Sequence, residues 1–395
     1  MGQIKLTPIA GMNTEGEDAS LSVGGDAPHH FVRDAVNVDL SPTGRVSMRE
    51  RLRKVSDLAL DNLWHSPLHG DTFATHGDKW VRLDPSNWSI QELATLGEGE
   101  VYHEVLNNRV CVSGPAGIFV FDGNAAHLLT IDTPPAPMVS ASPGSLPAGA
   151  YGVAVAWLRG DQESATSGIT HCEVGENGGL SVTLPLCFDA TVTHVRLYLT
   201  RQNGGELNRG EDYPVGTSHV VIPLLPAPGA PAKFHNLAPM PGGSYLRYWR
   251  GRLLTASGNV LRFSEPMAYH LHDPRHGFVQ FPQRITFVAP VETGIWVGQV
   301  DHVAFLAGDS PADMAMQRKK SRPPVPGSAV LVDSEQMGEI SQGGQVTAVW
   351  LADNGYVIGS SAGGVIEPHA NKLAGISATQ GASVVFGGRL LTVVR

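Results

Sequence analysis

Three widely separated segments of the chain repeat one short pattern, and this pattern limits the possible folds more than any other feature. In each, an apolar run enters a tight turn that contains Gly or Asn, and an Arg then opens a second apolar run; the segments are residues 106–112, 248–255 and 385–392. Such a turn between two apolar runs predicts an antiparallel hairpin with a twist-compatible turn. Weaker copies occur at 76–81 and 353–358.

The spacing of these hairpins indicates a β-propeller interrupted by a second domain. Arg252 and Arg389 are 137 residues apart, about three units of 46 residues, and a propeller blade takes roughly 40 to 50 residues. Arg109 and Arg252 are 143 residues apart, which is too long for one blade. The excess of roughly 100 residues is the size of a β-sandwich.

Two proline-rich segments bound this excess. Residues 133–137 and 226–231 read as stiff linkers, and five or more apolar runs lie between them at the spacing of sandwich strands. The order of these runs resembles a fibronectin type III domain. We therefore expect residues 134–238 to form an inserted fibronectin-like β-sandwich.

Composition supports an all-β chain. Gly (46 residues) and Pro (28 residues) are enriched, charged residues reach only 16%, and no long window has helical periodicity. No window approaches the roughly 20 apolar residues that a membrane-spanning helix needs, so we expect no such segment. The three cysteines show no metal-binding spacing, and their odd number argues against a disulfide framework.

The expected organisation has four parts: an N-terminal arm (1–30), a first propeller part (31–133), the sandwich (134–238) and a second propeller part (239–395), with about five to six blades in all. The C-terminal blade has only the hairpin around Gly388, whereas a blade normally has four strands. A second hairpin is expected at 34–48, where turn residues separate two extended runs. We expect this hairpin to supply the missing strands and close the propeller.

One cluster of possible metal ligands stands out. His270, His272, Asp273 and His276 lie within seven residues, a spacing from which a loop could hold a metal ion. The alternative is a polar turn between two strands, with Asp273-Pro274 setting the turn. We favour the polar turn, and we expect neither a metal nor an organic cofactor.

Two basic runs are candidates for contact with a DNA backbone or an acidic neighbour, or are merely solvated faces. They comprise Arg49, Arg51, Arg53 and Lys54, and Arg318, Lys319, Lys320 and Arg322. The net charge of −9 disfavours a protein that wraps nucleic acid, but it does not prevent passive passage of DNA.

The sequence offers no catalytic motif in its usual context. It has no His-Glu-x-x-His and no phosphate-binding loop, and the Gly-x-Ser-x-Gly of residues 359–363 lies in a glycine-rich run that reads as a hairpin turn rather than a nucleophile elbow. The seven tryptophans are spread about one per blade or module, which favours core anchors over a sugar-stacking platform. We expect no enzymatic activity. The alternative is a carbohydrate-binding or glycan-cleaving propeller with an accessory domain, because paired carboxylates on inner strands are not recognisable from one sequence.

Two stretches resemble tail proteins of tailed bacteriophages, in particular the propeller-built tube or nozzle proteins of short tails. The first is Phe31–Arg51, with its Arg-x-Ala-x-Asn-Val-Asp strand and a Gly-Arg return strand. The chain departs from the family pattern where Arg51-Leu52-Arg53 replaces an expected Arg-Pro-Gly. The second stretch combines Pro147–Trp157, Glu163-Ser164, Met240–Gly242 and Gly251–Pro266.

The resemblance covers about half of the chain and implies a structural virion protein. Such a protein forms a homo-oligomeric ring, by resemblance a hexamer, which continues the DNA channel and joins the portal or adaptor to distal tail or fibre proteins during DNA ejection. DNA would pass transiently, without sequence-specific binding. The implied location is the virion tail, assembled in the host bacterial cytoplasm.

Overall fold

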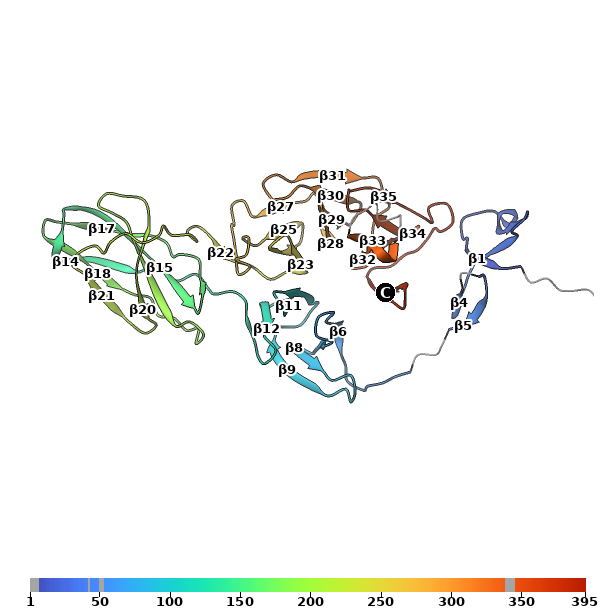
Figure 1. Cartoon of the computed structure of the whole chain (residues 1–395), viewed down its shortest axis with the longest axis horizontal. Coiled ribbons are helices and arrows are strands. Elements are labelled where there is room, and N and C mark those ends of the chain that lie inside the picture. The colour runs from blue at the N-terminus through green and yellow to red at the C-terminus, as the bar shows by residue number, and fades with distance from the viewer. Residues whose placement is uncertain (1–6, 42, 50–52, 338–344) are drawn as a thin grey trace, which may run out of the picture. The chain divides into compact units, whose positions relative to one another are not determined.

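The computed structural model describes residues 7–41, 43–49, 53–337 and 345–395. The chain divides into two compact units, one of residues 1–60, 256–261 and 280–395, the other of residues 61–255 and 262–279. Strands dominate both, as Figure 1 shows. The helical elements among the described residues are η1 (Asp18–Leu21) and α1 (Ser334–Met337).

Within the described ranges, five antiparallel sheets of four strands each are blades of a β-propeller. In every one the strands follow in chain order, the up-and-down arrangement of a blade. The first two sheets are β6 (Asp61–His65), β7 (Thr72–His76), β8 (Lys79–Leu83) and β9 (Ile90–Thr95), then β10 (Tyr102–Leu106), β11 (Arg109–Gly114), β12 (Gly117–Phe121) and β13 (Ala126–Leu128). The third is β23 (Ser244–Trp249), β24 (Arg252–Ser257), β25 (Val260–Phe263) and β27 (Phe278–Gln280). The last two are β28 (Ile285–Val291), β29 (Gly294–Gln299), β30 (Val303–Ala307) and β31 (Ala315–Lys319), then β32 (Val330–Asp333), β33 (Val346–Ala352), β34 (Gly355–Gly359) and β35 (Val365–Ile366).

The expected hairpin turns are present in all three repeats. Asn107 and Asn108 connect β10 to β11, and Arg250 and Gly251 connect β23 to β24, all with positive φ. Gly387 and Gly388, also with positive φ, connect β36 (Gly381–Phe386) to β37 (Arg389–Val394). Two consecutive residues with positive φ give the type I′ turn, whose twist matches that of the flanking strands.

Aromatic side chains anchor the blades. Trp80, Trp296 and Trp350 are fully buried, and the rings of Trp296 and Trp350 lie 5.4 Å apart, centroid to centroid. Gly359 lies against both rings, since a Cβ there would come within 2.6 Å of Trp296 and 2.7 Å of Trp350. The expected role of tryptophans as core anchors is thus confirmed for these residues.

The inserted domain is a β-sandwich between β13 and β22 (Ala238–Pro239). One sheet consists of β14 (Met138–Leu146), β18 (Gly178–Thr183) and β21 (His219–Ile222). The other consists of β16 (Gln162–Glu163), β15 (Gly149–Arg159), β19 (His194–Leu199) and β20 (Asn208–Pro214), with β17 (Thr170–Val174) also paired to β15. Tyr151, Val153, Val155 and Trp157 alternate along β15 and fill the core between the sheets. The prediction of an all-β, discontinuous propeller with an inserted fibronectin-like sandwich is confirmed.

The N-terminal region forms two small sheets. In one, β1 (Ile9–Met12) runs parallel to β3 (His29–Val32), which also pairs with β2 (Ser22–Val23). In the other, β4 (Val38–Leu40) and β5 (Val46–Met48) form the hairpin expected at 34–48.

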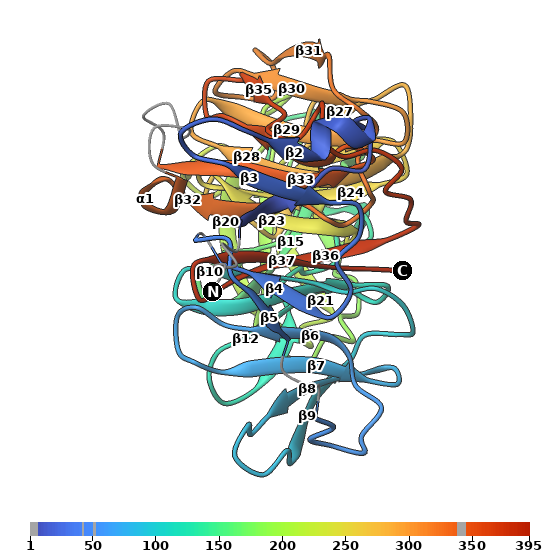
Figure 2. The ribbon, with the colours of Figure 1, turned by 90° about the vertical axis from the view of Figure 1, so that its right-hand side faces the viewer.

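The two terminal hairpins do not share a sheet. β4–β5 and β36–β37 are separate two-stranded sheets, and no ladder joins them among the described residues. Figure 2 shows β36 and β37 as one hairpin, coloured red. The C-terminal blade therefore has two strands, as expected, whereas closure of the propeller by residues 34–48 stays a prediction.

The three cysteines are free thiols in different surroundings. Cys111 lies in a blade and is fully buried, while Cys172 and Cys187 belong to the sandwich and are partly exposed. No disulfide links them.

Candidate functional site

Two of the three histidines of the proposed metal cluster make structural contacts. His270 and His272 are buried beside β22 and β26 (Leu271–His272), and this burial lowers the pKa of both rings. His270 donates from Nε2 to the carbonyl oxygen of Glu163 (2.9 Å), and His272 donates from Nδ1 to the carbonyl oxygen of Ala238 (3.3 Å). The first half of the expected polar turn, around His270 and His272, is thus a buried seam that joins a blade to the sandwich.

The carboxylate of the cluster belongs to a turn. Asp273 accepts hydrogen bonds from the backbone N–H of Arg275 (2.8 Å) and from its guanidinium (3.0 Å), which hold the pKa of Asp273 at about 2. His276 is exposed. The described residues hold no group of three or more His, Cys, Asp or Glu side chains arranged to bind a metal ion.

A buried charge network in the sandwich was not expected from the sequence. Arg196 reaches Glu163 through Nη1 (2.5 Å) and binds Asp212 through Nε and Nη2 (2.8 and 2.9 Å). Tyr198 donates to the other carboxylate oxygen of Glu163, and Arg209 adds a bond to Asp212 (2.8 Å). The side chains of Arg196 and Glu163 are only 15% and 10% exposed. The carbonyl of Glu163 holds His270, so the network supports the seam between sandwich and blade.

A cavity of about 620 Å³ lies along this seam, within one unit of the chain. It carries both signs of charge, with Arg109 and Lys233 on its wall together with Asp161. Glu163, which also lines it, is already paired with Arg196 and Tyr198. These groups do not combine into a nucleophile with a base or into a converging anion site.

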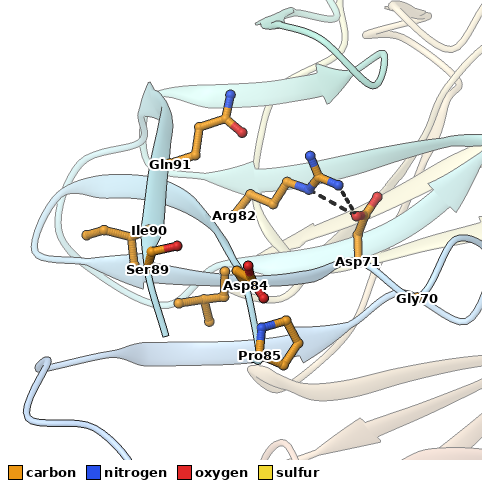
Figure 3. A pocket seen from close by; sticks show the side chains of 9 residues that line it. Gly70, Asp71, Arg82, Asp84, Pro85, Ser89, Ile90 and Gln91 are labelled. Carbon is orange, nitrogen blue, oxygen red and sulfur yellow. Dashed lines mark hydrogen bonds and ion pairs between the residues drawn. The ribbon is translucent and has the colours of Figure 1, made fainter. Parts of the chain in front are cut away.

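A second cavity, of about 320 Å³, lies at the edge of the first blade (Figure 3). Its principal charges neutralise each other, because Arg82 donates to Asp71 from both Nε (2.9 Å) and Nη2 (2.5 Å). Asp84 accepts hydrogen bonds from Ser86, and these lower its pKa. The cavity thus shows local ion pairing and turn capping rather than a catalytic arrangement.

The first basic run is not a continuous basic patch. Arg49 pairs with Asp39 (3.0 Å) and Lys54 pairs with Asp57. Arg53 is exposed, and Arg51 lies outside the described residues. The acids beside Arg49 and Lys54 reduce the attraction of these side chains for phosphate.

The second basic run lies along β31, the outer strand of its blade, and on the segment that follows. Lys319 sits over the ring of Phe305 at 5.5 Å from its centroid, and Arg322 lies 3.8 Å from Asp353. Arg318 and Lys320 lie on the same stretch. This run is mostly solvent-exposed, so it remains available for contact with an acidic neighbour.

The outward face of the C-terminal hairpin is apolar and open. Val384, Phe386, Leu391 and Val393 point to this face and are 55%, 72%, 42% and 76% exposed. The opposite face contributes Val385 and Leu390 to a core formed with the adjacent blade, and Ser383 and Thr392 hydrogen-bond there. Apolar residues occur on both faces of these two strands, so the sequence does not show which face is left exposed.

The N-terminal hairpin is also amphipathic. Val38 lies opposite Met48 and Leu40 opposite Val46, so these four apolar side chains share one face, while Asp39 and Ser47 share the other. Met48 is 84% exposed. We define the open faces of β36–β37 and β4–β5 as the C-terminal and N-terminal hairpin faces.

No family model matches the chain, and no curated protein matches it. Solved structures with some similarity include KlHsv2 with loop 6CD replaced by a Gly-Ser linker (8% identity, 85% of this chain and 89% of that chain, TM-score 0.31). Others are BBS1N in complex with ARL6DN (9%, 85% and 90%, 0.32) and a chain of the mitotic checkpoint complex (12%, 92% and 97%, 0.30). Within the described part of the chain, no helix is both long and apolar enough to span a bilayer.

Proposed function

We propose that this chain is a structural protein of a bacteriophage tail, of the tube or nozzle type, and that it is not an enzyme. In this role it forms a homo-oligomeric ring that continues the DNA channel and joins the portal or adaptor to distal tail parts. It acts in the virion tail, after assembly in the bacterial cytoplasm.

The observation that supports this proposal most is the insertion of a complete sandwich between two runs of propeller blades. The stretches that resemble tail proteins form corresponding elements: Asp34–Met48 contains the hairpin β4–β5, Pro147–Trp157 lies mainly in β15, and Gly251–Pro266 contains β24 and β25. These three stretches are therefore strands or hairpins on which the proposed architecture depends.

The charges and the packing suit a channel component. A net charge of −9 per chain repels phosphate, so DNA can pass without being retained. Strands such as β28, β29 and β30 are buried almost throughout, which makes the blade a stiff element. The buried histidines and ion pairs described above serve packing, which fits a scaffold.

Immunogold labelling of virions would test the proposal. An antibody against the purified chain should label the tails of particles from a lysate that contains the chain, in negative-stain micrographs. The control is the same antibody absorbed with the purified protein. Particles whose tails carry no more gold than this control would refute the proposal.

A further inference from the structure

We propose that the N-terminal hairpin face of one copy packs on the C-terminal hairpin face of a second copy of this chain. The contact is head-to-tail, because it joins two different surfaces. Repetition of such a contact produces a closed ring when the rotation between copies allows closure.

The C-terminal hairpin face exposes apolar side chains that a partner surface would bury. Its side chains include Phe386 and Val393, whose exposure of 72% and 76% places a continuous apolar surface in water. Burying apolar surface stabilises by about 25 cal/mol per Å², and contiguous open patches on soluble proteins commonly mark interaction sites. Among the described residues no further strand pairs with β36 or β37, and such open strand edges invite association.

The N-terminal hairpin face fits this surface in chemistry and form. It is a two-stranded sheet with an apolar face (Val38, Leu40, Val46, Met48) and a polar back. Two such faces can stack as the sheets of a sandwich do, about 10 Å apart. The polar back would then remain in contact with solvent.

Within one chain the two faces do not cover each other. The hairpins approach at Arg389 and Asp39, whose charged atoms are 4.0 Å apart. Phe386 and Met48 nevertheless stay 72% and 84% exposed. This ion pair joins Asp39, on the polar back of the N-terminal hairpin, to Arg389, on the C-terminal hairpin face, so the two apolar faces are left for a second copy to cover.

The N-terminal hairpin is held differently on its two sides along the chain. Residues 53–60 belong to no helix or strand, and six of these eight residues are exposed. Few contacts therefore hold the chain on this side of the hairpin, whereas on its N-terminal side Thr14 hydrogen-bonds to Lys372 and Ala374 and keeps the arm attached to its own chain.

The experiment uses two full-length variants with complementary defects. Phe386→Asp combined with Val393→Asp destroys the C-terminal hairpin face, and Val46→Asp combined with Met48→Asp destroys the N-terminal hairpin face. All four positions are exposed, so circular dichroism should show that both variants keep the fold. Mass is measured by light scattering after gel filtration.

We expect the wild-type chain to form an oligomer, and each variant alone to run at the 41.9 kDa of a single chain. An equimolar mixture of the variants should yield a species of twice that mass, because one intact pair of faces remains between them. Phe188→Asp, at an apolar side chain 94% exposed in the sandwich, is the matched control and should leave the wild-type mass unchanged.

A wild-type chain that stays monomeric, or a mixture in which no dimer forms, would overturn the proposal. The result is independent of the tail assignment. If gold labels the tails but the mixed variants form no dimer, only the hairpin contact is refuted. If the variants form the dimer but the tails carry no gold, only the tail role is refuted.

Discussion

Replacing Arg196 by Met should destabilise the sandwich strongly, because it removes the cation that pairs with Glu163 and leaves Asp212 with the more exposed Arg209 alone. The guanidinium makes one hydrogen bond to Glu163 and two to Asp212, and its side chain is only 15% exposed. Removing one partner of a buried ion pair costs about 3–5 kcal/mol. Met keeps most of the apolar stem, so the loss reports the missing charge.

Hydrogen exchange of the full-length protein would measure this cost locally. A loss of 3–5 kcal/mol corresponds to a roughly 140- to 3,700-fold drop in amide protection, at 1.4 kcal/mol per factor of ten. We expect the drop in peptides that cover β19 and β20, read by mass spectrometry. Peptides from the blade β28–β31 should keep their protection, because they belong to the other unit.

Arg209→Met is the matched control. Arg209 binds the same Asp212 but is 46% exposed, and exposed ion pairs contribute at most about 1 kcal/mol. Its loss should therefore reduce protection less than about fivefold. If Arg196→Met and Arg209→Met had equal effects, or if Arg196→Met cost less than about 1 kcal/mol, the buried network would not stabilise the domain as argued.

Three further predictions concern the same surfaces and domains. Residues 134–238, expressed alone, should unfold cooperatively when followed by the fluorescence of Trp157, the single tryptophan of that segment; a non-cooperative change would contradict independent folding. The hydrogen bond from Arg196 lowers the pKa of Asp212, so its stabilisation is complete above the unfolded value of about 3.9 and disappears as pH falls through the lower folded value; Asp212→Asn should flatten this part of the stability profile in urea titrations from pH 6 to about pH 2. The acidic chain should not shift duplex DNA in a gel at about 150 mM salt, and a shift abolished by Arg318→Gln with Lys320→Gln would show that β31 binds phosphate.

Local sequence signals predicted the hairpins well. Asn107-Asn108 and Gly387-Gly388 predict tight turns, because Asn and Gly tolerate positive φ and the apolar runs on both sides form the strands. Spacing between these turns then located the sandwich, whose strands lie between residues 138 and 222. These features depend on neighbouring residues or on segment length, both of which a single sequence displays.

The buried network could not be predicted in the same way. Glu163, Arg196 and Asp212 come from three strands, and their meeting depends on the register in which β15, β16, β19 and β20 pair. For the same reason His270 was interpreted as part of a polar turn, although its ring is directed to a carbonyl 107 residues earlier in the chain. The exposure of Phe386 likewise depends on which blade covers the other side of its hairpin.

The positions of the three thiols allow the inserted sandwich to be labelled selectively. Burial raises the pKa of Cys111 to about 12, and its side chain is inaccessible to solvent. At neutral pH Cys111 is therefore a protonated thiol that alkylating reagents do not reach. Cys172 and Cys187 both lie in the sandwich and are partly exposed. A maleimide dye added to the native protein would therefore mark the sandwich alone, without any engineered cysteine, and so provide a fluorescent reporter of that domain.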